Sequence, residues 1–471
     1  MARVMLVYPN LYEPWLPMGI SHLSSALKAS GHDVKLFDAT KYNLYNKINS
    51  IDMSLQDSMR KNYIYKPHKR WYEKIDISLE DFGDTFINSV NSYKPDVIGM
   101  SVMTHDVFPL TSYMLKKLEE YNGMVVVGGV VPTITPEWFD RSRADIVFRG
   151  EGEAMFPSIC DDPDKYSGGV IDGTTTEIND LVLPDWDIFD DMYFYWPFGK
   201  NVYRFGRFDR TRGCPNRCQY CVYSSDTYPE SMKKVRSKTN DRMISELVTY
   251  KDKYSLEFVT FNDDNFLCGN TEENEEFLNM YKIEVNLPYI ISAHASTINS
   301  KTARALSKSG CAHVSIGVES GSSRIRKEIL KRTTRDHDIV NAFHLLRDNK
   351  IHTSSLNMIG LPGETEDDFK DTLELNYRCK PDKGMCFYFY PYRGTPLGEY
   401  SVDNGLVSSN APQVNFGSSS VMPGFNNMKM YHDTFNVMIR YPPSIRYSIG
   451  KLCYKYDSMM KFFSKINSDK Y

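Results

Sequence analysis

Apolar residues in the first 150 positions form short continuous runs that alternate with stretches of helical spacing. The runs predict five strands, at residues 3–8, 33–37, 96–102, 124–127 and 145–148. After the first of them, Ile20, Leu23 and Leu27 recur on one helix face and Gly31 follows, which predicts a helix over 18–30. This alternation indicates an α/β fold with a doubly wound parallel sheet, on which ligands bind at the carboxyl ends of the strands.

The same alternation returns after residue 200. Six further apolar runs predict strands, at residues 202–211, 256–262, 289–295, 312–318, 353–359 and 385–390. Helical patterns fit between them, for example over 241–253. Six βα units favour a partial (β/α)6 barrel over a second flat sheet, although periodicity alone does not separate the two. In such a barrel, catalytic groups lie at the carboxyl ends of the strands.

Breaks in these patterns divide the chain into regions. We predict a first domain, a linker, a barrel and a C-terminal loop with a small helical region, at residues 1–152, 153–200, 201–400 and 401–471. Residues 41–80 are polar and typical of an insertion. Residues 401–420 are rich in Gly, Ser and Asn and predict a loop, which is either a lid over the barrel or an ordinary surface loop.

Composition and charge narrow the class of protein. The chain has 471 residues, of which 41% are hydrophobic and 25% charged, as in globular proteins of two or three domains. Its net charge of −4 leaves no basic footprint for a nucleic-acid partner or an anionic membrane. There is no signal-like segment at the start and no run of eighteen apolar residues, so we expect a cytoplasmic location and no membrane span. Nine cysteines, an odd number, also favour a reducing compartment.

Three of these cysteines carry the most specific chemical signal. Cys214, Cys218 and Cys221 have the spacing C-x3-C-x2-C at the end of the first predicted barrel strand. Three thiolates on one loop can bind three irons of a 4Fe–4S cluster and leave the fourth iron open to a small molecule. A zinc site usually needs a fourth Cys or His, and none lies within forty residues on either side. A disulfide would leave one thiol over, and chance clustering is the remaining alternative.

The cysteine loop resembles that of the radical S-adenosylmethionine (SAM) enzymes. Gly213 precedes the first cysteine and Tyr220 the third, where that family packs the adenine of SAM. Later segments match the family in order along residues 203–400. The resemblance implies further SAM contacts at Asp263 and Asp264 (amino group), Glu319 (ribose), and Ile359 and Gly360 (adenine). Asp263 and Asp264 also suit a helix cap, and the Gly-Leu-Pro-Gly-Glu-Thr turn after Ile359 also suits a structural turn.

The first domain resembles the cobalamin-binding domain of cobalamin-dependent radical SAM enzymes. The segments that carry this likeness are Pro17 to Ile20, Pro95 to Gly99, Val127 to Thr133 and Asp145 to Glu153. They imply cobalamin contacts at Pro9, Asn10, Ser101, Thr104, His105, Gly128, Gly129, Gly150 and Glu151. The Asp-x-His-x-x-Gly motif, which supplies a cobalt ligand in methionine-synthase-type domains, is absent, so the lower cobalt ligand is open and His105 is a candidate. Methylthiotransferases are disfavoured because no cysteine precedes Cys160.

The resemblance implies three cofactors: a 4Fe–4S cluster, SAM and cobalamin. In the family, one-electron cleavage of SAM gives a 5′-deoxyadenosyl radical, and methylcobalamin delivers a methyl group to the substrate radical. We therefore expect an oxygen-sensitive methyltransferase that acts on an unactivated carbon, or on phosphorus, of a small molecule. We also expect an electron donor such as flavodoxin or ferredoxin.

Two alternatives to methyl transfer stay open. One is a ring-forming enzyme of the magnesium-protoporphyrin cyclase type, without net methyl transfer. The other is a non-enzymatic cobalamin sensor, which would not need an open iron. The sequence identifies no general acid or base. Tyr388 and Tyr390 share one face of the last strand, which would line the barrel interior in one interpretation and suit a flat or apolar substrate.

Overall fold

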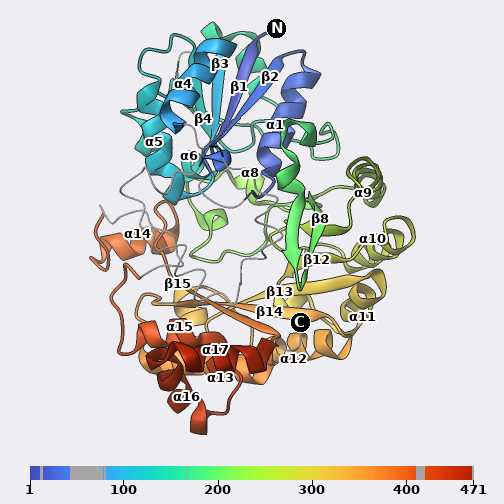
Figure 1. The fold of residues 1–471 in the computed structure, drawn as a ribbon, viewed down its shortest axis with the longest axis vertical. Coiled ribbons are helices and arrows are strands. Elements are labelled where there is room, and N and C mark those ends of the chain that lie inside the picture. The colour runs from blue at the N-terminus through green and yellow to red at the C-terminus, as the bar shows by residue number, and fades with distance from the viewer. Residues whose placement is uncertain (11–13, 43–77, 79–80, 167, 410–419, 469–471) are drawn as a thin grey trace.

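The computed structural model describes residues 1–10, 14–42, 78, 81–166, 168–409 and 420–468 (Figure 1). Most of the predicted insertion at 41–80 and half of the predicted loop at 401–420 lie outside these residues. The described chain forms a parallel sheet at the N-terminus, a curled sheet in the middle and a helical C-terminus (Figure 1). The predicted α/β fold class is therefore confirmed.

Six parallel strands form the N-terminal sheet, in the order β2-β1-β3-β4-β5-β6. Their bounds are Arg3–Tyr8 (β1), Asp33–Asp38 (β2), Val97–Ser101 (β3), Met124–Gly128 (β4), Ile146–Arg149 (β5) and Gly169–Asp172 (β6). The first five are the predicted strands. The sequence pattern missed β6 because this edge strand is largely exposed and lacks an apolar run.

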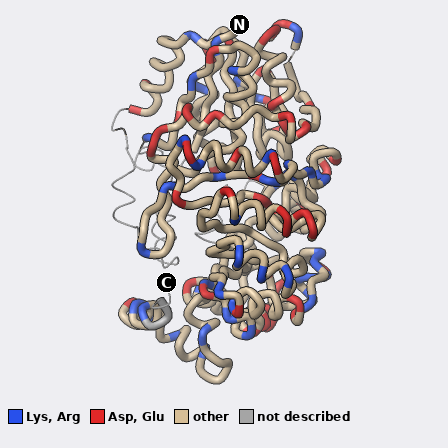
Figure 2. Tube along the Cα trace, turned by 90° about the vertical axis from the view of Figure 1, so that its right-hand side faces the viewer, with Lys and Arg blue, Asp and Glu red and all other residues tan. Residues whose placement is uncertain are grey.

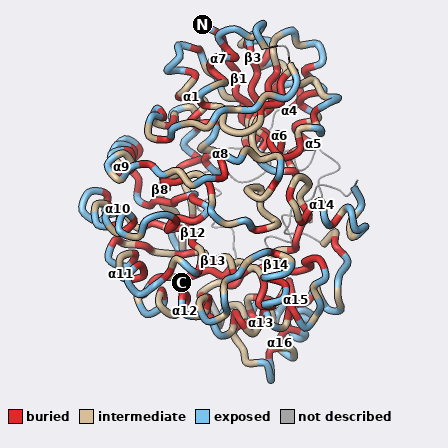
Figure 3. Tube along the Cα trace, turned by 180° about the vertical axis from the view of Figure 1, so that it is seen from behind, coloured by how far each residue is buried: buried red, intermediate tan, exposed pale blue. Residues whose placement is uncertain are grey.

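Helices cover both faces of this sheet because neighbouring residues of its strands point to opposite sides. Leu6 of β1 packs with α1 (Met18–Ala29) and α7 (Phe156–Asp161), whereas Met5 packs with α4 (Phe82–Tyr93) and α5 (Phe108–Lys117). Figure 3 shows buried strands between more exposed helices. The short helix α6 (Val130–Ile134) follows β4 directly. The order 2-1-3-4-5 puts the change of winding direction, where such sheets bind ligands, between β1 and β3.

The second sheet has seven strands in the order β15-β14-β13-β12-β11-β8-β7. Six of them run parallel, as predicted: Asn201–Phe208 (β8), Phe258–Phe261 (β11), Tyr289–Ala293 (β12), Cys311–Glu319 (β13), His352–Ile359 (β14) and Lys383–Tyr388 (β15). β7 (Tyr195–Phe198) was not predicted; it pairs antiparallel with β8 and lies in the segment predicted as a linker. The parallel strands form the partial barrel.

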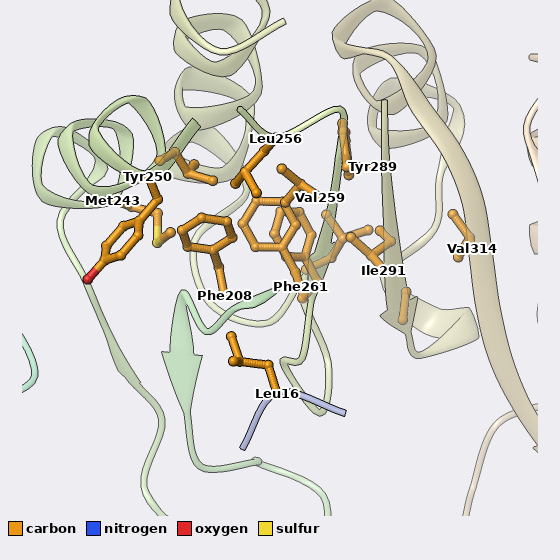
Figure 4. Packing of buried hydrophobic residues seen from close by; sticks show 14 of the residues in the cluster. Leu16, Phe208, Met243, Tyr250, Leu256, Val259, Phe261, Tyr289, Ile291 and Val314 are labelled. Carbon is orange, nitrogen blue, oxygen red and sulfur yellow. The ribbon is translucent and has the colours of Figure 1, made fainter. Parts of the chain in front are cut away.

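Five helices follow strands of the barrel. They are Asn240–Tyr254 (α9), Thr271–Glu284 (α10), Ser300–Ser309 (α11), Asp336–Asp348 (α12) and Glu366–Cys379 (α13). One buried cluster runs from α1 to these helices, and Figure 4 shows Leu16, which precedes α1, beside Phe208 of β8. Trp186 is fully buried against Phe208 and Tyr250, so the segment before the barrel is docked onto it. The two sheets therefore share a core.

The C-terminal region consists of helices. They are Pro396–Asp403 (α14), Met428–Met438 (α15), Pro443–Lys455 (α16) and Asp457–Ser468 (α17). Tyr388 stacks on His432 of α15, with ring centroids 4.0 Å apart, and packs with Phe369 of α13. This is the helical side of the sheet, so the interpretation that placed Tyr388 in the barrel interior was wrong. Tyr390 packs on Tyr392.

Acidic and basic residues are interspersed along the chain trace in Figure 2, in keeping with the small net charge. Across the described residues, no helix combines the length and apolar character that a membrane crossing requires.

Candidate active site

One cavity of about 300 Å³ lies between the two sheets. Ser101, Gly128 and Gly150, at the carboxyl ends of β3, β4 and β5, line one side of it. Gly213, which precedes the first cysteine, and Tyr223, which follows the third, line the other. The edge predicted to bind cobalamin and the loop predicted to bind the cluster therefore face a common space.

A short ribbon carries the cysteine loop. Thr211–Arg212 (β9) pairs antiparallel with Arg236–Ser237 (β10), and between them Cys214 N donates to Lys233 O at 3.2 Å. Gly213 has φ +90°, and a Cβ there would collide with the carbonyl of Lys234. Only glycine fits this approach, which explains the residue before the first cysteine.

The three thiols lie in different surroundings. Cys218 is buried, whereas Cys214 and Cys221 are half-buried, and none of the three forms a disulfide. Burial raises the pKa of the Cys221 thiol to about 12 and also raises that of Cys214. Thiolates at these positions therefore need a bound cation to compensate their charge. Within the described residues, no three Cys, His, Asp or Glu side chains are arranged to hold a single metal ion.

The donor set fits a cluster because a cube takes each thiolate on a different iron. Two of the three sulfurs also accept hydrogen bonds: Arg332 Nη1 donates to Cys218 Sγ at 3.4 Å, and Asn216 Nδ2 donates to Cys214 Sγ at 3.7 Å. Such donors stabilise the negative charge of thiolate ligands. Cys214, Cys218 and Cys221 would hold the cluster there.

Arg332 joins two residues predicted to bind SAM. Besides Cys218, its Nη1 lies 3.3 Å from Tyr220 Oη and 4.0 Å from Glu319 Oε1, and its Nη2 donates to Gly317 O at 2.9 Å. Burial raises the pKa of Glu319, while Arg332 and the Tyr220 hydroxyl act in the opposite direction. Arg332 was not among the predicted site residues, because it follows Glu319 by thirteen residues and belongs to no recognised motif of the sequence.

The structure separates the two adjacent aspartates. Asp263 is buried and accepts from Thr211 N and Thr211 Oγ1, each at 2.6 Å, and from Arg210 N at 3.1 Å. Its carboxylate therefore holds the start of β9, and burial raises its pKa to about 6. The side chain of Asp264 instead bonds to the Tyr223 hydroxyl beside the cysteine loop, and burial raises its pKa.

The helix-cap alternative for this segment does not hold. The next helix, α10, is capped by Asn270, whose Oδ1 accepts from Glu272 N at 2.8 Å and Glu273 N at 3.2 Å. Asp264 therefore does not cap this helix, and of the two aspartates it is the one whose side chain lies beside the cysteine loop.

Ile359 and Gly360 lie at the end of β14. The Ile359 side chain is fully buried among Phe369 and Leu373 of α13, on the helical side of the sheet. Gly360 has φ +83°, and its N–H donates to Glu364 Oε2 at 2.7 Å, so the predicted structural turn is present. An adenine contact at these two residues stays a prediction, and for Ile359 it would involve the backbone.

Five of the nine predicted cobalamin contacts line the cavity. They are Ser101, Gly128, Gly129, Gly150 and Glu151. A Cβ on Gly128 would meet no atom closer than 3.8 Å, and one on Gly19, across the cavity, would meet none within 4 Å, so both glycines leave open space. This cradle of missing side chains fits a broad ligand such as a corrinoid, which these residues would hold.

The other predicted contacts lie outside that lining. Asn10 Nδ2 donates to Thr40 Oγ1 at 3.0 Å, and neither Pro9 nor Thr104 lines the cavity. His105 is buried, with its ring 5.1 Å from that of Tyr392 and 5.0 Å from that of Trp138, and burial lowers its pKa to about 4. It therefore contacts the segment after β15, and its role as a cobalt ligand stays a prediction.

Known protein families match both halves of the chain. A B12 binding domain model matches residues 66–159, and a Radical SAM superfamily model matches residues 209–375. An uncharacterized methyltransferase of Pyrococcus horikoshii is 27% identical over 341 residues, which cover 68% of this chain and 72% of the relative.

Two solved structures have a similar fold. The radical S-adenosylmethionine methyltransferase TsrM from Kitasatospora setae, with cobalamin and a [4Fe-4S] cluster bound, has a TM-score of 0.62 at 15% identity and covers 88% of this chain and 76% of its own. The cobalamin-dependent S-adenosylmethionine radical enzyme OxsB, with aqua-cobalamin and S-adenosylmethionine bound, has a TM-score of 0.64 at 16% identity and covers 99% and 72%. At these identities the likeness shows the fold.

Proposed function

This chain is a cobalamin-dependent radical SAM enzyme, in which a B12-binding domain precedes a radical SAM domain, and we propose that it transfers a methyl group to a small molecule. The acceptor is an unactivated carbon, or phosphorus. One observation carries the proposal: the cysteine loop and the glycine-lined carboxyl edge of the first sheet border the same cavity. A methyl carrier and a radical source at these two places would both have access to one substrate.

When bound, the cluster supplies one electron to cleave SAM and cobalamin carries the methyl group. The chain's own residues hold and orient these groups. Asp264 beside Cys214 and Cys221 provides a carboxylate for the SAM amino group, and Glu319 with Tyr220 provides the ribose and adenine contacts.

The relatives support methyl transfer unevenly. The Pyrococcus horikoshii relative and TsrM are both described as methyltransferases, whereas OxsB is described only as a radical enzyme. That description names no methyl transfer, so a radical reaction without net methyl transfer, as in the ring-forming alternative, remains the second candidate. A sensor without catalysis gains no support from these relatives.

SAM with a deuterated methyl group tests the proposal, even before the substrate is known. The anaerobically reconstituted enzyme, given this SAM and a low-potential reductant, should release 5′-deoxyadenosine and place the label on its cobalamin. With substrate, or with an extract that contains it, the label should appear in a product. Deoxyadenosine release without label transfer to cobalamin or product would favour the ring-forming alternative. Absence of deoxyadenosine from protein that carries the cluster would contradict both.

A further inference from the structure

Glu151 was predicted as a cobalamin contact, but its carboxylate is already occupied. Oε2 accepts from Arg236 Nη1 and from Thr176 N, both at 2.9 Å, and Oε1 forms a second bond with Arg236 Nη2. Burial alone would raise the pKa of Glu151, yet the guanidinium groups of Arg236 and Arg212 hold it below its ordinary value. The carboxylate is therefore ionised, and it is bound by Arg236 of the barrel domain and by the backbone N–H of Thr176.

The second glutamate of the same loop makes a parallel contact. Glu153 Oε1 lies 2.9 Å from Arg212 Nη2, and Arg212 also reaches Glu151 Oε1 at 3.5 Å and Asp209 Oδ2 at 3.3 Å. Both glutamates belong to the Gly-Glu-Gly-Glu segment that follows β5. One short segment of the predicted cobalamin-binding edge therefore forms two ion pairs with the barrel domain.

Their partners are side by side on the ribbon that carries the cysteines. Arg212 and Arg236 are register partners of β9 and β10. Arg212 stands two residues before Cys214, and the chain returns to Arg236 just after Lys233, whose carbonyl accepts from Cys214 N. A displacement of this ribbon would therefore move the cysteine loop with it.

The two segments also pack closely against each other. Gly150 has φ +91°, and a Cβ there would collide with the side chain of Met232, in the short helix α8 (Glu230–Lys233) that lies between the cysteines and β10. The glutamate-bearing turn thus rests on the same returning segment. The ion pairs and this close packing therefore join the same two segments, the turn after β5 and the segment that carries the cysteine loop.

Stability alone is a weak reason for so many charges at this contact. Removal of buried charges from water offsets most of the Coulomb attraction of an ion pair, so an apolar contact would hold the domains as well. A guanidinium that binds a carboxylate through two bonds, however, fixes both its distance and its orientation. The network is suited to setting geometry.

We propose that Glu151 and Glu153 are positioning residues, whose ion pairs with Arg236 and Arg212 hold the cysteine loop against the cobalamin-binding edge and so set the spacing between the two cofactors. The inference rests on the proposed function, because the spacing matters only if a radical formed at one cofactor must meet a methyl group held at the other. Reactions of positioned groups are sensitive to displacements of about 1 Å.

The experiment compares Glu151→Gln and Glu153→Gln, separately and together, with Asp172→Asn. The control removes a similar arginine contact, Arg149–Asp172, which lies within the first sheet and does not reach the barrel. Pulsed electron paramagnetic resonance on enzyme loaded with cob(II)alamin and reduced cluster measures the distance between the two spins. We expect a longer mean distance and a broader distribution in the glutamate variants, and an unchanged distance in Asp172→Asn.

A second readout separates positioning from folding. Methylated product per 5′-deoxyadenosine should fall on the order of tenfold in the double variant, because SAM cleavage continues while its radical is misplaced. If a variant loads poorly, hydrogen–deuterium exchange of the apo-protein should still rise at residues 211–216 in the glutamate variants alone.

Other outcomes would overturn the inference. An unchanged spin–spin distance in all variants would do so. Loss of cobalamin affinity in Glu151→Gln with an unchanged distance would do so too, because it would mean that Glu151 binds cobalamin directly. Unchanged exchange at residues 211–216 in a poorly loading variant would also contradict it. Failure of the wild-type protein to bind cluster or cobalamin would instead contradict the proposed function.

Discussion

Arg332 donates to the sulfur of Cys218 at 3.4 Å, and the same nitrogen lies 3.3 Å from the Tyr220 hydroxyl. This guanidinium, whose side chain is only 9% exposed, thus links a thiol predicted to bind the cluster to two residues predicted to contact SAM, because Glu319 is also 4.0 Å away. Hydrogen bonds to cluster sulfurs are among the protein features that set reduction potentials. If the cluster and SAM bind as proposed, Arg332 acts on both of them.

Substitution of Arg332 by Gln should lower the reduction potential of the cluster. The donor stabilises the more negative, reduced state, and a loss of about 1 kcal/mol between the two states corresponds to about 40 mV for one electron. A potentiometric titration followed by electron paramagnetic resonance measures the shift. Arg335→Gln is the control, because Arg335 is exposed and pairs with Asp338 on the surface. Equal potentials in Arg332→Gln and wild type would refute the assignment.

The fold was largely predictable because its buried strands carry continuous apolar runs. Strands β6 and β7 were not predicted, because β6 is exposed and β7 lies in a segment without the alternating pattern. For the site, the cysteine motif predicts cluster chemistry at Cys214, and this role stays a prediction. The site was not predictable at Arg332, or in the choice between Asp263 and Asp264. Those depend on which atoms distant parts of the chain bring together, and on which neighbours have already taken a carboxylate's hydrogen bonds.

The adjacent aspartates should respond differently to substitution by alanine. Asp263→Ala leaves two backbone N–H groups and the Thr211 hydroxyl without their acceptor in a buried place, which should cost about 3 kcal/mol of stability. Asp264→Ala should leave the melting temperature unchanged and weaken SAM binding on the order of tenfold. Thermal unfolding of the apo-protein and equilibrium binding of SAM to the loaded protein give the two values. A reversed pattern would show that the aspartates were assigned to the wrong roles.

Buried His105 should make the apo-protein less stable at acid pH. Burial lowers its pKa from 6.5 to about 4, so below pH 6.5 the unfolded chain binds a proton that the folded chain does not. Stability from this group is therefore nearly complete above pH 6.5 and is lost as the pH falls toward 4, by about 1.4 kcal/mol at pH 5.5.

Replacement of His105 by Phe, which preserves the ring packing, should remove this part of the pH dependence. The melting temperatures of wild type, His105→Phe and the exposed-site control His337→Gln, each measured at pH 7.5 and 5.5, check the prediction. The difference between the two pH values should shrink only in His105→Phe. A difference of the same size in all three proteins would mean that other groups dominate the acid instability.

Gly128 and Gly129 are adjacent, yet the structure gives them different reasons to be glycine. Gly129 has φ +106°, and a Cβ there would lie 2.7 Å from the carbonyl oxygen of Val102, so the fold itself requires glycine. Gly128 has no such conflict, since its Cβ would meet nothing closer than 3.8 Å and would point into the cavity. Gly129→Ala should therefore lower the melting temperature of the apo-protein.

Gly128→Leu should instead leave that temperature nearly unchanged and reduce cobalamin affinity by at least about tenfold, because the added side chain occupies the space of the ligand. Titration of the apo-protein with hydroxocobalamin, followed by its visible absorption, measures the affinity without any need for turnover. Full affinity in Gly128→Leu would mean that the corrinoid does not enter this cavity. The proposal that cobalamin binds at the carboxyl edge of β4 would then be wrong, because it rests on the open space beside Gly128.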